Sequence, residues 1–121
     1  MLSRTADHLF WMARYMERAE NTARMLGVSY EMSLLPQSHD AAEQGWRGLL
    51  SISELTSSFA QRYGEVSARN VMDFMIRDES NPSSILCCVH AARENARAVR
   101  GALTTEVWET QNQTWLEFNK L

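Results

Sequence analysis

The fold class is decided by residues 3–36, which read SRTADHLFWMARYMERAENTARMLGVSYEMSLLP. Apolar residues recur there at alternating spacings of three and four, the period of a long helix that packs against other helices at shallow angles. Pro36 cannot continue a helix, so we expect a helix from about Ser3 to Leu35. Its predicted inward seam is Leu2, Ala6, Leu9, Ala13, Met16, Glu20, Ala23, Gly27, Tyr30 and Leu34.

The middle of the chain predicts two further helices. Asp40 and Glu43 have the spacing of a capping box, which starts a second helix that ends near Gly64. The residues it is expected to bury are Leu49, Ile52, Leu55, Phe59 and Tyr63. Ser67 is predicted to cap a short third helix, whose apolar side is Val71, Phe74 and Met75.

A fourth helix is expected to begin at Asn81–Pro82, a cap followed by a first turn. Its predicted seam is Ile85, Val89, Ala92, Ala96, Val99 and Leu103. The helix either continues through Gly101 to Phe118 or bends at that glycine. We therefore predict one all-α domain over residues 1–121, an antiparallel bundle of four to five helices with long first and last helices.

Composition and charge exclude several functional classes. A chain of 121 residues forms one domain, and its net charge of −3 argues against general nucleic-acid binding. The apolar runs are too short to span a bilayer, and the first residues lack the apolar block of a signal peptide. The two cysteines, Cys87 and Cys88, are adjacent and suggest no oxidising compartment. We expect a cytoplasmic protein that binds neither membranes nor nucleic acid.

The basic residues are almost all arginine, with Lys120 the single lysine among twelve. Arginine is preferred for planar, bidentate and partly buried pairing, although a GC-rich genome would produce the same bias. Six of the eleven arginines gather in two polar clusters, one on the first helix and one on the fourth. The candidate polar or anion-binding residues are Arg14, Glu17, Arg18, Glu20, Asn21 and Arg24, with Arg93, Asn95, Arg97 and Arg100.

These two clusters predict that the first and fourth helices pack together. Glu20 lies in the predicted seam, where a glutamate must be protonated, paired or facing a cavity. Glu17 and Glu20 are the natural partners for the arginines of the fourth helix. Three interpretations remain open: an ion-pair network interlocking across the contact, a site for an anion such as a carboxylate or phosphate, or two solvated faces.

Recognisable catalytic patterns are lacking. His8, His39 and His90 are scattered, without the HxxxH or ExxH spacing of a di-metal bundle. Cys87 and His90 are three residues apart, but two ligands do not make a metal site. No glycine-rich phosphate loop, GxSxG or CxxC occurs. We expect no metal and no cofactor, and the sequence motifs identify no catalytic residue.

Several motifs together resemble the alpha-E family of bacterial proteins. They are MLSRTADHLFWMARYMERAENTAR (residues 1–24), NPSSIL (81–86), AARENARAVR (91–100) and EVWE (106–109). The family is all-helical and named for a glutamate–arginine motif, which would here be Glu17–Arg18. Residues 36–66 carry little of the resemblance, and His8 stands where the family more often has asparagine.

The resemblance implies a larger context for this chain. Members of the family are much longer, so this polypeptide would be the N-terminal portion, with a related arginine–glutamate-rich helix recurring elsewhere. Similar proteins are encoded beside, or fused to, ATP-grasp amidoligase-like proteins and transglutaminase-like peptidases. This points to a system that forms or modifies peptides, and to a protein partner of one of those two kinds.

Three hypotheses for function follow. In the first, the chain is a non-catalytic helical module that partners an ATP-grasp amidoligase-like enzyme. In the second, the cluster is an active or anion-binding site of the full-length protein, with Glu17 or Glu20 as general base and arginines holding a carboxylate or phosphate. In the third, the chain is a purely structural oligomer. Because apolar residues recur to the last position, we expect self-association through residues 108–118.

Overall fold

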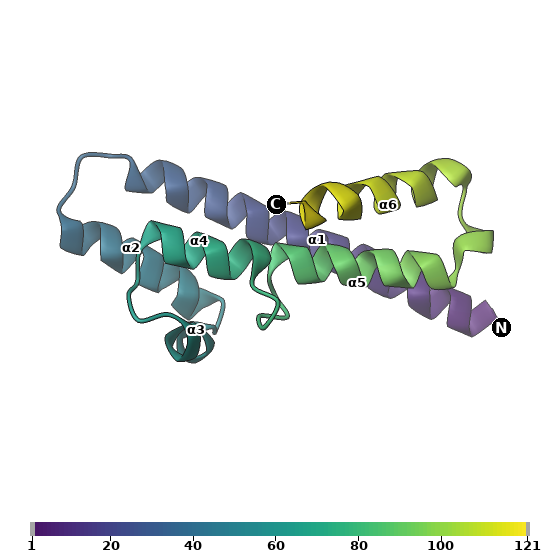
Figure 1. Cartoon of the computed structure of the whole chain (residues 1–121), viewed down its shortest axis with the longest axis horizontal. Coiled ribbons are helices and arrows are strands. Elements are labelled where there is room, and N and C mark those ends of the chain that lie inside the picture. Colours follow the sequence, from purple (N-terminus) through teal and green to yellow (C-terminus); the bar gives the residue numbers. More distant parts are fainter. Residues whose placement is uncertain (1, 121) are drawn as a thin grey trace.

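A computed structural model describes residues 2–120, which form six α-helices and one short 3₁₀-helix (Figure 1). The all-α prediction is confirmed, although six α-helices form where four to five were predicted. The elements in chain order are α1 (Leu2–Ser33), α2 (His39–Ile52), α3 (Thr56–Arg62), α4 (Ala68–Arg77), α5 (Ile85–Ala98), the 3₁₀-helix η1 (Arg100–Ala102) and α6 (Thr105–Asn119).

Helix α1 extends along the whole molecule, and α2, α4 and α5 pack along it (Figure 1). Helices α4 and α5 follow each other almost in line and run antiparallel to α1, and α6 turns back along α5. Helices α2 and α3 lie at the end of the molecule where α1 ends. Within residues 2–120, no helix combines the length and apolar composition needed to cross a membrane.

The hydrophobic core lies between α1, α2, α4 and α5. Its most deeply buried side chains have at most a few per cent of their surface exposed, and large aromatic residues from α2, α3 and α4 fill its centre. The main members are Leu26, Trp46, Leu50, Phe59, Val71, Phe74, Met75, Cys88 and Val89. The core therefore forms along the carboxyl-terminal half of α1 and continues along α5.

The face that α1 buries is not the predicted one. The residues that it turns away from solvent include Thr5, His8, Met12, Tyr15, Ala19, Thr22, Leu26, Ser29 and Ser33, which also alternate at spacings of three and four. The predicted seam lies one residue further along, about 100° round the helix. Glu20 and Ala23 are accordingly exposed, and the buried glutamate inferred from the sequence does not exist.

The second predicted helix is two helices. Glu54 has φ 59°, a left-handed conformation that no helix continues, so α2 ends at Ile52 and α3 begins at Thr56. Ile52 is 80% exposed, contrary to the prediction, whereas Phe59 is buried as predicted. The N-cap is also different, because it is Ser38, not Asp40, whose side chain accepts a hydrogen bond from the first turn.

Helix α4 forms as predicted. The Ser67 hydroxyl accepts a hydrogen bond from the Asn70 amide at 3.2 Å, and the apolar side of the helix is buried. The start of α5 was predicted wrongly. Ser84 is its N-cap, and the buried Asn81 instead donates to the Phe74 carbonyl at 3.1 Å. Asn81 therefore ties the end of α4 to the turn that leads into α5.

The predicted seam of α5 is confirmed. The four members within α5 are buried, namely Ile85, Val89, Ala92 and Ala96, while beyond its end Val99 is buried and Leu103 is half-buried. Of the two alternatives predicted at Gly101, the bend forms and the continuous helix does not, because the chain turns through η1, which contains Gly101, before α6 begins at Thr105.

Two alanines of α5 should tolerate no larger side chain. Ala92 and Ala96 are fully buried. Ala92→Leu is expected to lower the free energy of unfolding by about 1–3 kcal/mol, because extra methylenes in a packed contact force the backbone to shift. The exposed Ala98 of the same helix is the control, and Ala98→Leu should change stability by less than about 0.5 kcal/mol. Urea denaturation followed by circular dichroism measures both, and equal tolerance would contradict the close packing of α5.

Candidate functional site

The glutamate–arginine dipeptide lies in a shallow hollow on the surface of α1. The hollow has a volume of about 170 Å³ and is lined by Arg14, Glu17, Arg18, Asn21, Thr22 and Met25. Arg14 Nη1 lies 3.9 Å from Glu17 Oε2, and both side chains are more than half exposed. Arg18 places its guanidinium over the ring of Tyr15, 5.5 Å from the ring centroid. Two cations, one carboxylate and one amide therefore surround a small open space.

Glu20 and Arg24, the remaining members of the first cluster, pair with each other outside this hollow. The Arg24 guanidinium donates to Glu20 Oε1 at 2.6 Å, and the two side chains are 66% and 67% exposed. Exposed pairs at this spacing contribute only about 0.3–0.5 kcal/mol. The charged surface of α1 therefore adds little to the stability of the fold.

The arginines of the second cluster lie on α5 and η1, and their side chains contact α6, a glutamate of α5 or solvent. Arg93 Nε donates to Asn112 Oδ1 on α6 at 3.0 Å, and Arg97 pairs with Glu94 on its own helix at 3.8 Å. The Arg100 guanidinium lies 4.9 Å from the centre of the Trp108 ring, a cation–π contact. Among residues 2–120 no ion pair joins Glu17 or Glu20 to these arginines, so α1 and α5 pack together as predicted without the predicted interlocking charges.

Asn95 connects α5 to α1 in a different way. Its Oδ1 lies 2.9 Å from Nδ1 of His8, and its Nδ2 donates to the Ala91 carbonyl at 2.9 Å. Because the amide nitrogen already serves as a donor, Oδ1 is the acceptor and His8 Nδ1 carries the proton. His8, to which the sequence assigned no role, therefore forms a hydrogen bond between α1 and α5.

The aromatic residues of α6 pack within the chain. The Trp115 ring lies 4.6 Å from the His90 ring on α5, and Trp115 and Phe118 both pack against the core. Val107 and Leu116 keep about two-fifths of their surface exposed. Self-association through residues 108–118 stays a prediction. The large rings of this segment, Trp108, Trp115 and Phe118, are already half-buried within the chain.

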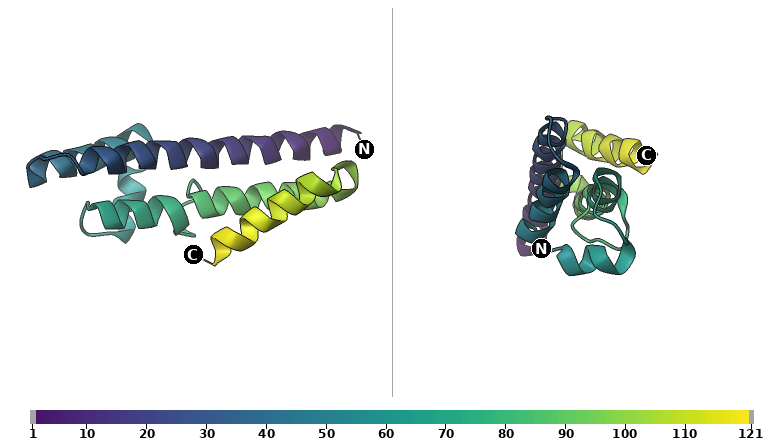
Figure 2. Two further views of the ribbon diagram at one scale, coloured as in Figure 1. Left: turned by 90° about the horizontal axis from the view of Figure 1, so that it is seen from above. Right: turned by 90° about the vertical axis from the view of Figure 1, so that its left-hand side faces the viewer.

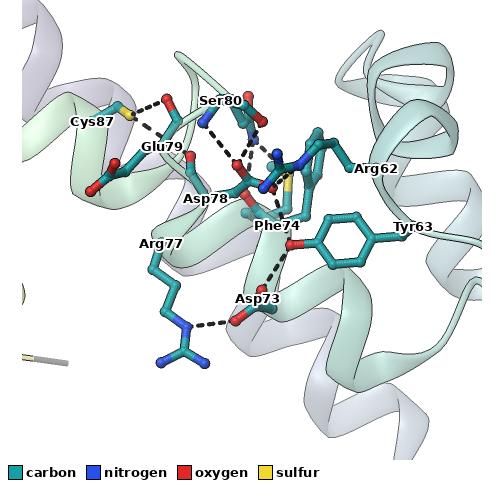
Figure 3. A network of polar contacts seen from close by, with 11 residues as sticks. Arg62, Tyr63, Asp73, Phe74, Arg77, Asp78, Glu79, Ser80 and Cys87 are labelled. Atoms are coloured by element: carbon teal, nitrogen blue, oxygen red, sulfur yellow. Dashed lines mark hydrogen bonds and ion pairs between the residues drawn. The ribbon is translucent and has the colours of Figure 1, made fainter.

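A third polar cluster, which the sequence did not predict, joins α3 to α4 (Figure 3). The Tyr63 hydroxyl lies 2.7 Å from Asp73 Oδ2 and 3.1 Å from Asp78 Oδ2. Asp78 is almost wholly buried, and its Oδ1 accepts hydrogen bonds from the amide and hydroxyl of Ser80 at 2.8 and 2.6 Å. Arg62 Nε lies 3.4 Å from Oδ2 of Asp78. The one available signal was Asp-x-Ser directly after a helix, which favours an Asx turn.

The contacts in this cluster shift three pKa values. Burial, together with hydrogen bonds to Asp73 and Asp78, raises the pKa of Tyr63. The hydrogen bonds from Tyr63 and Arg77 lower the pKa of Asp73. Burial alone would raise the pKa of Asp78, but the two hydrogen bonds from Ser80, with Tyr63 and Arg62, outweigh burial and lower it. Both carboxylates are therefore charged at neutral pH and engaged with protein groups, which marks a structural cluster.

Chemistry that needs a metal or a thiolate finds little support in the described residues. In residues 2–120 no three His, Cys, Asp or Glu side chains converge to hold a metal ion. Cys88 is fully buried, and burial raises the pKa of its thiol, which keeps it protonated at neutral pH. Cys87 directs its sulfur to the carbonyl oxygens of Asp78 and Glu79, at 3.8 and 3.6 Å.

Comparison with known proteins identifies the family. A family model described as a predicted alpha-helical domain with a conserved ER motif matches residues 1–120, including the segment in which we saw little resemblance. Uncharacterized proteins of Mycobacterium bovis and Mycobacterium tuberculosis are each 30% identical to the chain over 118 residues, which cover 87% of this chain and 13% of the relative. No solved structure matches. Glu17–Arg18 is the only Glu–Arg dipeptide in the sequence, and the chain belongs to the Alpha-E family.

Proposed function

We propose that this chain is a non-catalytic helical module that docks on a protein partner. The observation that carries the proposal is an apolar groove between the end of α1 and the start of α2. The groove has a volume of about 440 Å³, and its lining includes Val28, Met32, Leu35 and Trp46. The first three are between 55% and 59% exposed, and contiguous exposed apolar side chains are typical of interaction sites.

The partner we propose is an ATP-grasp amidoligase-like protein, and the module acts in the cytoplasm as its accessory subunit or domain. The resemblance to the alpha-E family supplies this class of partner. The relatives' length supports a multidomain setting, because the chain spans about 13% of the relatives that it matches. We therefore treat residues 1–121 as one helical domain, the N-terminal portion of a longer protein.

The test is capture of the purified ATP-grasp amidoligase-like protein by the tagged chain. Val28→Glu and Met32→Glu place a carboxylate in the groove and should weaken binding at least about tenfold, because the charge loses water on docking. Ile52→Glu is the matched control, since Ile52 is an exposed apolar residue of α2 outside the groove. Absence of binding, or equal loss in all three variants, would overturn the proposal.

A second candidate function is anion binding at the hollow around Glu17–Arg18. Its support is the convergence of Arg14 and Arg18, because Arg18 forms no ion pair among residues 2–120 and keeps its donors for a planar anion. Titration calorimetry with inorganic phosphate and with acetate tests it. Arg18→Met should abolish binding and Arg24→Met should leave it intact, whereas an absence of heat with wild type would reject this candidate.

A further inference from the structure

Helix α1 carries a second apolar stripe, most of which stays exposed among residues 2–120, with only Leu9 and Met16 half-buried. The stripe keeps the spacing of three and four over almost the whole helix, and seven of its nine members are exposed. We call it the outer stripe, and it consists of Ala6, Leu9, Ala13, Met16, Glu20, Ala23, Gly27 and Tyr30, with Leu34 directly after the end of the helix. Leu34 is 66% exposed and Tyr30 is 45% exposed.

The outer stripe is more apolar than the face that α1 buries. The outer stripe contains one polar residue, Glu20, whereas the inward face contains two threonines, two serines and a histidine. A helix that faces only its own core has the opposite distribution, with the more apolar side inward. The pattern therefore indicates that the outer stripe is also buried, in an assembly larger than the single chain.

Most of this face is open to solvent in the structure of residues 2–120. A β-carbon added at Gly27 would meet no atom within 4 Å. Both views of Figure 2 place α4, α5 and α6 on one side of α1, and α2 lies beside the carboxyl-terminal end of α1. The small residues Ala13, Ala23 and Gly27 allow the backbone of another helix to approach closely.

We propose that the outer stripe pairs with the outer stripe of a second copy of this chain, as two antiparallel helices related by a two-fold axis between residues 21 and 22. In such an isologous contact every pair of facing residues, one from each copy, occurs twice. The axis sets Met16 against Gly27 of the second copy, and Ala13 against its Tyr30. Leu9 meets Leu34 at the ends. Large side chains thus face small ones in the inner layers, over a contact about 38 Å long.

The charges beside the stripe favour the same pairing. In a pair of antiparallel helices, the residues one position after a seam residue flank the contact and approach the equivalent flanking residues of the partner helix. On α1 the residues that directly follow Met16 and Ala23 are Glu17 and Arg24. Here that places Glu17 beside Arg24 of the second copy, twice across the axis. Glu20 enters the contact already neutralised by Arg24 of its own helix, at 2.6 Å. A parallel pairing would instead set Glu17 beside Met12 and Arg24 beside Ala19 of the second copy, without an ion pair, so the charges favour the antiparallel orientation.

Sedimentation equilibrium over a wide range of concentration tests the pairing. We expect a reversible species of twice the single-chain mass of 13.9 kDa. Ala13→Glu places a carboxylate against Tyr30 of the second copy and should weaken association at least about tenfold. Ala60→Glu, the same change at an exposed alanine of α3, should leave it unchanged. A chain that stays monomeric, or a dimer that Ala13→Glu does not weaken, overturns the proposal.

Charge exchange and cross-linking test the orientation. Glu17→Arg and Arg24→Glu should each weaken the dimer, and the double variant should recover most of the loss. Under oxidised glutathione, a mixture of Met16→Cys and Gly27→Cys chains should form the mixed disulfide, whereas a parallel dimer would cross-link each variant to itself. The pairing is independent of the groove, so Val28→Glu should leave the dimer intact, and a dimer lost in Val28→Glu would place the contact at the groove instead.

Discussion

Phe74→Ala is expected to lower the free energy of unfolding by about 3–5 kcal/mol, the largest effect of any single truncation proposed for this chain. Phe74 is 1% exposed, and its ring packs edge-on against Phe59 at 5.4 Å and Tyr63 at 5.8 Å. The three rings join α3 to α4, so a cavity at Phe74 removes contacts from both helices. Neighbouring side chains are themselves held by the core and cannot collapse into the space.

The measurement is urea denaturation of Phe74→Ala beside Ile52→Ala. Ile52 is 80% exposed, so its truncation should change stability by less than about 0.5 kcal/mol. A loss below about 1 kcal/mol for Phe74→Ala would contradict the aromatic packing of α3 on α4.

Asp78→Ala should have the second largest effect, a loss of about 3 kcal/mol at neutral pH, because hydrogen bonds to a charged acceptor contribute about 1.5–3 kcal/mol each. The substitution leaves the amide of Ser80 without its acceptor and removes the carboxylate beside Arg62. Glu79→Ala is the control, since the neighbouring acid is exposed and should be nearly neutral to truncation. Equal stability of the two variants would contradict a structural role for Asp78.

The same cluster predicts a dependence on pH. Asp73 and Asp78 have pKa values lowered from their ordinary 3.8, so their contribution is complete above that pH and is lost as the pH falls through the folded-state pKa values. Wild type should therefore lose stability below about pH 4. The difference between wild type and Asp78→Ala should shrink over the same range, and a difference that stays constant from pH 7 to pH 3 would contradict the lowered pKa of Asp78.

The sequence was sufficient to predict α4 and the buried face of α5. Both helices carry a single apolar stripe, so only one rotation of each buries it. Helix α1 carries two stripes with the same spacing, and the apolar pattern favours the outer stripe as the core-facing side. The structure places that stripe outside and a face with Thr22 and His8 inside. Apolar content alone therefore does not identify the core-facing side of a helix that carries two stripes.

The break between α2 and α3 and the cluster around Tyr63 could not be predicted from local pattern. No glycine or proline marks residue 54, where a glutamate adopts φ 59°. Tyr63 meets carboxylates ten and fifteen residues further along the chain, which the turn between α3 and α4 brings together. The polar residues of the first cluster all lie on α1, but their exposure depends on the rotation of that helix, which local pattern did not predict.

The central claim is that Glu17–Arg18 lies on a binding surface of α1 and does not hold the fold together. Chemical denaturation of wild type beside Glu17→Gln and Arg18→Met tests it most directly. Because Glu17 is 66% exposed and its nearest cation is 3.9 Å away, each variant should unfold within about 0.5 kcal/mol of wild type. A loss of about 3–5 kcal/mol in either variant is what a broken buried ion pair costs, and it would contradict the claim.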